Sequence, residues 1–372
     1  MKISFRTDAS LQMGSGHVMR CLTLADALKA QGAQCHFISR EHSGNLLEVI
    51  RQRGHGVTGL PAPLSQPSDA ADAIPTLAHA DWLGCDWQTD AQQTRTILST
   101  LQPNWLVVDH YALDQRWEFA MQPYCQKLMV IDDLADRTHY CDLLLDQNLG
   151  RQPEDYVNLV PTTCQVFTGP RYALLRPEFA ALRDYSLKRR ANSQHKQIRQ
   201  LLITMGGVDM PNATGQVLQA LKTSSLPADC HITVVMGSTA PWLAQVRELA
   251  EKMPWPTSVL VNINNMAQCM ADSDLAIGAA GSTSWERCCL GLPSMLVILA
   301  DNQIRSCAEL GATNAVKVIG NFEFIEKKLQ SQLMSFLTDK KSLKNCSDAA
   351  SEICSGDGAS LILMKLTLSN LL

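Results

Sequence analysis

The sequence predicts an α/β protein built from two doubly wound, Rossmann-like domains that face each other across a cleft. The chain has 372 residues, about the length of two domains. Short apolar or β-branched runs alternate with longer helical patterns, which favours parallel sheets made of βα units. This alternation restarts after a polar, basic stretch near the middle of the chain, so we expect each half to form its own sheet.

The first half begins with a strand and a glycine-containing loop that opens a helix. Apolar residues from Val18 to Leu28 recur along one stripe of this helix, as expected for a helix packed on a sheet. We expect strands at 2–5, 35–39, 56–60, 105–109, 127–132 and 143–146, and helices at 17–31, 45–52 and 89–101.

The stretch 183–199 is polar and basic and contains Lys188-Arg189-Arg190. Such a run is usually a solvated linker rather than a nucleic-acid contact. We therefore expect an N-terminal domain at 1–182, a linker at 183–199, a C-terminal domain at 200–320 and a helical C-terminal segment at 321–372.

The second half repeats the strand, loop and helix pattern of the first. Each expected strand is a short apolar run that ends in a loop and is followed by a helical pattern. We expect strands at 201–205, 231–236, 259–262, 275–278, 294–299 and 315–318, and helices at 212–221, 240–252, 266–270, 282–290 and 303–310. In such sheets, ligands bind at the carboxyl ends of the strands.

The composition excludes several classes of protein. Hydrophobic residues make up 46% of the chain and charged residues 18%, so the chain can form cores and is not disordered. The net charge of −4 gives no signal for nucleic acid or anionic membranes, and neither is expected as a partner. The longest dense apolar run, 295–300, is too short to cross a bilayer. We expect a cytoplasmic protein, and the oligomeric state is left open.

The 13 cysteines are scattered, odd in number and never spaced Cys-x-x-Cys. This distribution is typical of buried thiols in a reducing compartment rather than of a disulfide framework. No His-Glu-x-x-His or similar cluster is present. We therefore expect neither a metal nor a cofactor.

The loop after the first strand contains Gly14 and Gly16 and leads directly into a helix. Glycines let backbone amides approach a ligand closely, and a helix N-terminus favours an anion. A dinucleotide fingerprint would need a third glycine, where Met19 stands, and an acidic end to the second strand, where Ser39-Arg40 stands. A nicotinamide-dependent enzyme is therefore not expected.

His17 lies in the first turn of that helix, where the positive end of the helix dipole disfavours protonation. A neutral imidazole at the edge of a cleft can take a proton from water, so His17 is a candidate general base. The alternative is a structural histidine that caps the helix or bonds locally. The position beside a glycine loop favours the catalytic role.

A second loop, 278–281, ends in Gly281 and is followed by Ser282, Thr283 and Glu286. Its amides and hydroxyls could hold a diphosphate without a metal, and Glu286 could accept bonds from ribose hydroxyls. The alternative is a capping pair of Thr283 and Glu286 that serves helix stability alone.

Three more turns follow expected strands on the ligand side of the sheets. Gly206-Gly207 forms a third glycine loop, and Tyr111 could contact a sugar or serve as ordinary packing. Asn302 lies in Asp301-Asn302-Gln303, which could instead be a helix cap. Asp132-Asp133 is expected to be a solvated acidic turn.

Several motifs, taken together and in order, resemble one enzyme family, the UDP-2,4-diacetamido-2,4,6-trideoxy-β-L-altropyranose hydrolases of pseudaminic acid biosynthesis. The matches extend from the first strand to about residue 320, and after it only Gly356-Asp357-Gly358-Ala359-Ser360 is similar. The motifs are Arg6-Thr7-Asp8, Gly14-Ser15-Gly16-His17-Val18-Met19-Arg20-Cys21, Val108-Asp109-His110-Tyr111, Ile131-Asp132-Asp133, Asp146-Gln147-Asn148, Gly169-Pro170-Arg171-Tyr172-Ala173-Leu174-Leu175-Arg176, Met205-Gly206-Gly207-Val208-Asp209, the loop 278–287 and Asp301-Asn302-Gln303.

The resemblance implies a GT-B-type fold, similar to the glycosyltransferase that adds N-acetylglucosamine to a lipid-linked cell-wall precursor. It implies inverting hydrolysis of the UDP-sugar at the anomeric carbon, with His17 as general base and Glu286 at the nucleotide. Tyr111 and Asn302 match positions that line the sugar site. Together with the loops above, the expected substrate-binding residues are Gly14, Gly16, Tyr111, Arg171, Arg176, Gly206, Gly207, Gly281, Ser282, Thr283, Glu286 and Asn302.

Two other functions remain open at this point. A GT-B glycosyltransferase would use the same nucleotide-binding loops but transfer the sugar to an acceptor, and the fold does not separate the two. A non-catalytic nucleotide-sugar-binding protein would use the loops without turnover.

Overall fold

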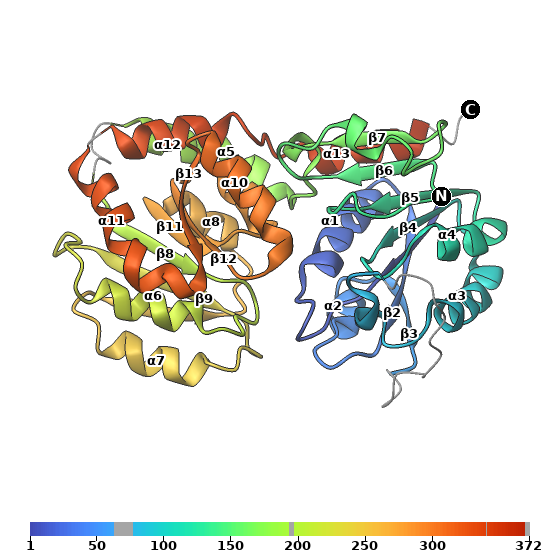
Figure 1. Ribbon diagram of the computed structural model, residues 1–372, viewed down its shortest axis with the longest axis horizontal. Coiled ribbons are helices and arrows are strands. Elements are labelled where there is room, and N and C mark those ends of the chain that lie inside the picture. The colour runs from blue at the N-terminus through green and yellow to red at the C-terminus, as the bar shows by residue number, and fades with distance from the viewer. Residues whose placement is uncertain (63–76, 193–196, 340, 369–372) are drawn as a thin grey trace. The chain divides into compact units, whose positions relative to one another are not determined.

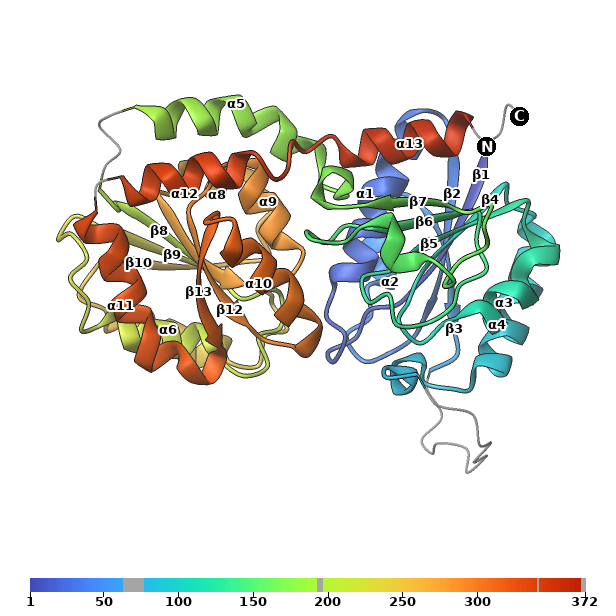
Figure 2. The same ribbon diagram turned by 45° about the horizontal axis from the view of Figure 1, so that its top comes forward.

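The computed structural model describes residues 1–62, 77–192, 197–339 and 341–368 (Figure 1). The chain divides into two compact units. Unit 1 contains Met1–Leu174 and Asp357–Leu372, and unit 2 contains Leu175–Gly356. Each unit has one parallel sheet with helices on both faces (Figure 2), which confirms the prediction of two doubly wound domains. Within the described ranges, no helix is both long enough and apolar enough to span a bilayer.

Unit 1 contains a seven-stranded sheet with the order β3-β2-β1-β4-β5-β6-β7. The order reverses between β1 and β4, so this is the switch point at which such sheets bind ligands. The strands are β1 (Lys2–Thr7), β2 (Gln34–Arg40), β3 (Gly56–Leu60), β4 (Trp105–Asp109), β5 (Lys127–Ile131), β6 (Leu143–Asp146) and β7 (Gln165–Thr168). The helices are α1 (Gly16–Ala30), α2 (Leu47–Gln52), α3 (Trp87–Leu101), α4 (Gln115–Met121) and α13 (Gly358–Leu368), with short 3-10 turns η1 (Ala80–Leu83), η2 (Gln122–Tyr124), η3 (Pro153–Tyr156) and η4 (Pro170–Tyr172).

The central strands of unit 1 are buried on both faces. On β4, Trp105 and Val107 pack in one core with α1 and α13, whereas Leu106 and Val108 pack in the other with α3 and α4. Because successive side chains of a strand point to opposite faces, a strand covered on both sides is apolar throughout. This is why the short apolar runs of the sequence identify these strands.

Unit 2 contains a six-stranded parallel sheet with the order β10-β9-β8-β11-β12-β13, and its order reverses between β8 and β11. The strands are β8 (Gln200–Thr204), β9 (His231–Met236), β10 (Thr257–Val261), β11 (Leu275–Ala279), β12 (Ser294–Ile298) and β13 (Val316–Asn321). The helices are α5 (Pro177–Ala191), α6 (Ala213–Leu221), α7 (Leu243–Glu251), α8 (Met266–Asp272), α9 (Thr283–Cys289), α10 (Ile304–Ala312), α11 (Ile325–Thr338) and α12 (Ser342–Ser351), with 3-10 turns η5 (Asp301–Gln303) and η6 (Phe322–Phe324). Helices α6, α7 and α11 pack on one face of this sheet.

The stretch expected as a solvated linker is different in the structure. Most of it lies in α5, which belongs to unit 2, and residues 193–196 lie outside the described residues. The basic side chains bind backbone carbonyls and a carboxylate: Arg183 donates to Cys289 and Ser351, and Arg190 donates to Ser273. Arg189 forms an ion pair with Asp274 at 2.7 Å. These arginines therefore satisfy the hydrogen-bonding requirement of backbone carbonyl groups. The charge pattern of the sequence does not reveal these contacts.

The C-terminal segment is also not a single helical body. Helices α11 and α12 belong to unit 2, but α13 belongs to unit 1, so the chain passes from one unit to the other twice. Ile362 and Leu366 of α13 are fully buried in the core beside α1, and Trp105 donates from its indole nitrogen to the Leu366 carbonyl at 3.2 Å. A Cβ at Gly358 would come within 2.3 Å of the Ala173 carbonyl, so the close start of α13 requires glycine.

Candidate active site

The candidate site of unit 1 lies where β1 and β4 end. These strands are neighbours, with Thr7 in register with Asp109. The loop after β1 leads into α1, whose first turn carries His17. The carboxyl ends of parallel strands share one edge of the sheet, so the topology brings His17 and Asp109 together although they are 92 positions apart.

His17 and Asp109 form a close pair. The Nδ1 atom of His17 lies 2.6 Å from Oδ1 of Asp109, and the His17 residue is only 9% exposed. An ionised carboxylate only accepts hydrogen bonds, so Nδ1 must carry the hydrogen. The other ring nitrogen, Nε2, is then the atom that can take a proton.

Arg20 keeps the Asp109 carboxylate ionised. It donates from Nε to Oδ2 at 2.6 Å and from Nη2 to Oδ1 at 2.7 Å, a bidentate arrangement. Burial alone would raise the pKa of Asp109, but Arg20 and His17 hold it well below its usual range. Asp109 is thus a permanent negative charge behind His17.

The same arginine connects the pair to a third strand end. Arg20 donates from Nη1 to Oδ2 of Asp133 at 2.6 Å, and the hydroxyl of Tyr111 donates to the same oxygen at 2.7 Å. The Tyr111 ring is edge-on to His17, with 4.6 Å between centroids. Four side chains from the ends of β4 and β5 and from α1 therefore hold His17 in one orientation.

The Arg6-Thr7-Asp8 motif, at the end of β1, supports this site through buried ion pairs. Asp8 is fully buried and accepts from Nη1 of Arg6 at 2.6 Å and from the backbone N–H of Arg40 at 2.7 Å. Arg6 also pairs with buried Asp90 at 2.6 Å. These charges compensate one another in the core and fix the start of the loop that carries His17.

Asp132-Asp133 is not the solvated turn that we expected, because Asp132 is fully buried. The hydroxyl of Tyr156 lies 3.0 Å from Oδ2 of Asp132 and 2.9 Å from Oδ2 of Asp146. One phenolic hydrogen can serve only one of these oxygens, so the second contact needs a proton on a carboxyl group. Burial and the charge of Asp133 raise the pKa of Asp146 to about 7, although Arg151 Nε lies 3.1 Å away.

In unit 2, two predicted loops meet at the switch point. β8 leads to Gly206-Gly207 and β11 leads to Gly281, and the two strands pair with Gly278 in register with Thr204. Gly206 has a φ of +88°, which favours glycine. A Cβ at Gly237 would come within 2.2 Å of the Gly207 carbonyl, so the loops that follow β8 and β9 are tightly packed against each other.

Glu286 is not part of a capping pair. Ser282 is the N-cap of α9 and makes no side-chain cap bond, and the Thr283 hydroxyl accepts from Nη1 of Arg287. The Glu286 side chain is 17% exposed and lies 3.7 Å from Nη2 of Arg176. Burial raises the pKa of Glu286 to about 7, although Arg176 and Arg287 oppose this shift.

The remaining predicted residues are distributed over both units. Gly14 (φ +77°) and Gly16 form the turn into α1, near His17. Arg171 is exposed over the Tyr172 ring in η4, after edge strand β7, whereas Arg176 belongs to unit 2 beside Glu286. Asn302 is exposed in η5; its neighbour Gln303 lies 3.6 Å from where a Cβ of Gly281 would be.

Asp109, Arg20 and Asp133 are site residues that the sequence does not predict, although each lies in one of the family motifs given above. The signal that could have identified Asp109 is a carboxylate at the end of a fully apolar strand next to the glycine loop. Such a residue is buried and needs a cationic or hydrogen-bonding partner.

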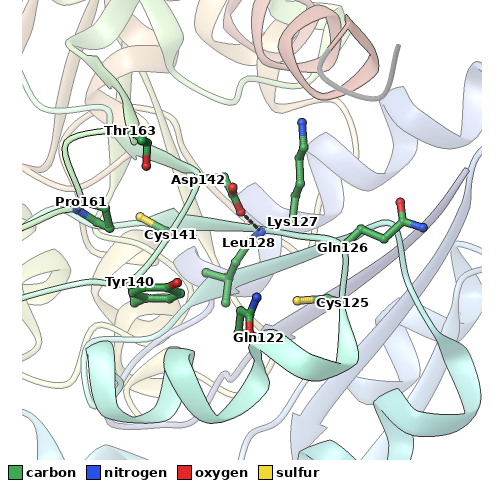
Figure 3. A pocket seen from close by; sticks show the side chains of 10 residues that line it. All are labelled: Gln122, Cys125, Gln126, Lys127, Leu128, Tyr140, Cys141, Asp142, Pro161 and Thr163. Carbon is green, nitrogen blue, oxygen red and sulfur yellow. Dashed lines mark hydrogen bonds between the residues drawn. The ribbon is translucent and has the colours of Figure 1, made fainter. Parts of the chain in front are cut away.

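A separate pocket of unit 1 lies at the opposite edge of the sheet, where β5 and β6 begin (Figure 3). Its lining includes Cys125, Tyr140 and Cys141, and Asp142 accepts from the backbone N–H of Leu128 at 2.7 Å. This pocket therefore does not include His17 or its partners. Among the described residues, no group of three or more His, Cys, Asp or Glu side chains could hold a metal ion.

Comparison with known proteins gives one family match. Residues 201–360 match the family described as the glycosyltransferase family 28 C-terminal domain. Among solved structures, MurG of Acinetobacter baumannii has a TM-score of 0.66 at 16% identity, covering 98% of this chain and 99% of that chain. The expected GT-B-type fold is thus confirmed.

Two curated proteins are similar over most of this chain. An uncharacterized protein of Methanocaldococcus jannaschii is 26% identical over 82% of this chain, which spans only 57% of that relative's length. The UDP-2,4-diacetamido-2,4,6-trideoxy-beta-L-altropyranose hydrolase of Campylobacter jejuni is 27% identical over 76% of this chain and 86% of its own.

The raised pKa of Asp146 predicts a specific pH dependence of stability. Between about pH 4 and pH 7 the unfolded chain ionises this carboxyl while the folded protein keeps its proton, so stability falls as pH rises through that window, by at most ~1.4 kcal/mol per pH unit. Asp146→Asn should remove this slope, as measured by urea unfolding at several pH values. Parallel pH profiles for the two proteins would contradict the prediction.

Proposed function

We propose that this protein hydrolyses a UDP-linked sugar, with water attacking the anomeric carbon and UDP leaving with inversion. The observation that carries the proposal is the His17–Asp109 pair, in which a buried carboxylate leaves Nε2 as the proton-accepting atom. A base of this kind matches a reaction whose nucleophile is water. The hydrolase from Campylobacter jejuni supports UDP-2,4-diacetamido-2,4,6-trideoxy-β-L-altropyranose as the substrate.

In the proposed reaction, Nε2 of His17 removes a proton from water as the oxygen bonds to the anomeric carbon. The bond from that carbon to the diphosphate oxygen breaks, and UDP carries the electron pair away. UDP is already a stable leaving group, so no acid has to protonate it. Backbone amides of the Gly206-Gly207 and Gly281 loops of unit 2 would bind the diphosphate, and Glu286 the ribose.

A glycosyltransferase is the second candidate, because the family match of unit 2 and the structural likeness to MurG both concern transferase folds. The two functions differ in what accepts the sugar. A transferase would leave the UDP-sugar intact until an acceptor is supplied.

The direct test is incubation with the UDP-sugar and no acceptor, with products followed by NMR. We expect equal amounts of UDP and free 2,4-diacetamido-2,4,6-trideoxy-L-altrose, with the inverted anomer formed first. Excess EDTA should leave turnover unchanged, because the proposed chemistry uses no metal. No turnover without an acceptor, or activity restored only by Mg²⁺ or Mn²⁺, would contradict the proposal.

Replacing either member of the His17–Asp109 pair should impair the chemical step. His17→Asn should lower kcat by about 10²–10⁴ because the base is lost. Asp109→Asn should lower kcat by at least about 10², because the hydrogen of His17 is then no longer held on Nδ1. UDP affinity and melting temperature should change little for His17→Asn. Kinetics and calorimetry measure these effects.

Asp26 provides a matched control, because it forms another Asp–His pair in unit 1, with 2.7 Å between Oδ1 and Nε2 of His55. Asp26→Asn should leave kcat unchanged. If His17→Asn lowers the melting temperature but turns over normally, His17 is structural and the proposed base is wrong.

Glu286→Ala should weaken UDP binding about 10- to 100-fold, since a charge-assisted hydrogen bond contributes ~1.5–3 kcal/mol. Isothermal titration with UDP measures the change. Glu178→Ala is the control, because Glu178 also pairs with Arg176, at 3.0 Å, but is more exposed. Unchanged affinity in folded Glu286→Ala would exclude a role in nucleotide binding.

A further inference from the structure

Three aromatic side chains form a cluster next to His17, and the reaction proposed above gives none of them a role. Tyr111 follows β4, whereas His79 and Trp82 belong to the short segment around η1. The ring centroids are 4.4 Å apart for His79 and Trp82, 5.4 Å for His79 and Tyr111, and 5.7 Å for Trp82 and Tyr111. The Trp82 ring is edge-on to His17 at 6.4 Å.

These rings differ in burial. Tyr111 is buried, and its hydroxyl is held by Asp133. Trp82 and His79 are only half-buried, so each keeps exposed surface beside His17. Trp82 is stacked on Tyr111 with 28° between the ring planes, which fixes the direction of its face. The result is a cluster of rings at His17 in which Trp82 and His79 keep some exposed surface.

Anchoring of η1 does not account for Trp82. The neighbouring residue Leu83 is 1% exposed and packs in the core under the sheet, so it already attaches this turn to unit 1. Trp82 itself lies outside that core and contacts the rings around His17. A half-buried tryptophan next to a candidate base is better suited to contact a ligand.

The position of the base determines which part of a ligand meets these rings. A water activated at Nε2 of His17 has to reach the anomeric carbon, so the sugar rather than the nucleotide must lie beside His17. Aromatic faces pack against apolar C–H groups, and a neutral imidazole offers one donor and one acceptor. Burial lowers the pKa of His79, which favours this neutral form.

We propose that Trp82, braced by His79 and Tyr111, forms the wall of the sugar subsite and favours sugars that carry methyl groups, such as the methyl of an acetamido group or a C6 methyl. This inference rests on the proposed function, because it takes His17 as the base. Trp82 is thereby a specificity-determining residue, and its contribution is to sugar binding rather than to UDP binding.

The test measures binding of UDP-2,4-diacetamido-2,4,6-trideoxy-β-L-altropyranose and of UDP by isothermal titration, in a His17→Asn background that prevents turnover. Trp82→Ala and Trp82→Leu should each weaken binding of the UDP-sugar about 10-fold and leave UDP affinity within about twofold. Trp82→Phe keeps an aromatic face and should retain most of the affinity. Melting temperatures and near-UV circular dichroism identify any variant that fails to fold.

Trp87→Ala is the matched control, because Trp87 is another half-buried tryptophan of unit 1, on α3 under the guanidinium of Arg116. It should bind both ligands like the parent. The proposed role of Trp82 would be contradicted if folded Trp82→Leu kept its affinity for the UDP-sugar. It would also be contradicted if the affinities for UDP and for the UDP-sugar fell by the same factor. Failure of the unaltered protein to hydrolyse the UDP-sugar would instead contradict the proposed function, and the binding difference would still decide the role of Trp82.

Discussion

The buried carboxylate of Asp109 is the constraint on which the candidate site depends. An ionised group without solvent must be fully compensated, and here Arg20 and His17 provide the compensation. This requirement fixes the orientation of the imidazole and the position of its hydrogen. Arg20 in turn holds Asp133, which accepts the Tyr111 hydroxyl. One buried charge therefore orders side chains from α1 and from the ends of two strands.

Unit 2 achieves binding geometry in a different way. Its loops depend on glycines that allow close packing at the switch point, and the acidic side chain of Glu286 is partly buried beside Arg176. Such a loop set serves transferases and hydrolases equally, since both bind a nucleotide. In the proposed function, the chemical difference then comes from unit 1, where the proposed base and the aromatic rings lie. This is why the chemical step is tested with variants of unit 1, whereas Glu286→Ala in unit 2 tests nucleotide binding alone.

The sequence predicted the fold well where strands are covered on both faces, as in β11 and in β4 up to its last residue, because such strands are uniformly apolar. Edge strand β7 was missed because it is only half-buried and its sequence is not a fully apolar run. Most of α5 was assigned to a linker because its arginines suggested a solvated segment. In the structure these arginines bind backbone carbonyls that are distant in the sequence. His17 could be identified from its glycine loop. Its partner Asp109 could not, since their contact depends on strand order across 92 positions.

The most direct measurement is the tautomer of His17, by long-range ¹H–¹⁵N NMR on protein with ¹⁵N-labelled histidine, assigned through the signal lost in His17→Asn. An ionised Asp109 bound at Nδ1 predicts that, in the neutral ring, Nδ1 carries the hydrogen and Nε2 is unprotonated. Asp109→Asn should alter this spectrum. A neutral His17 with its hydrogen on Nε2 would contradict the central claim, because that nitrogen could not then accept a proton from water.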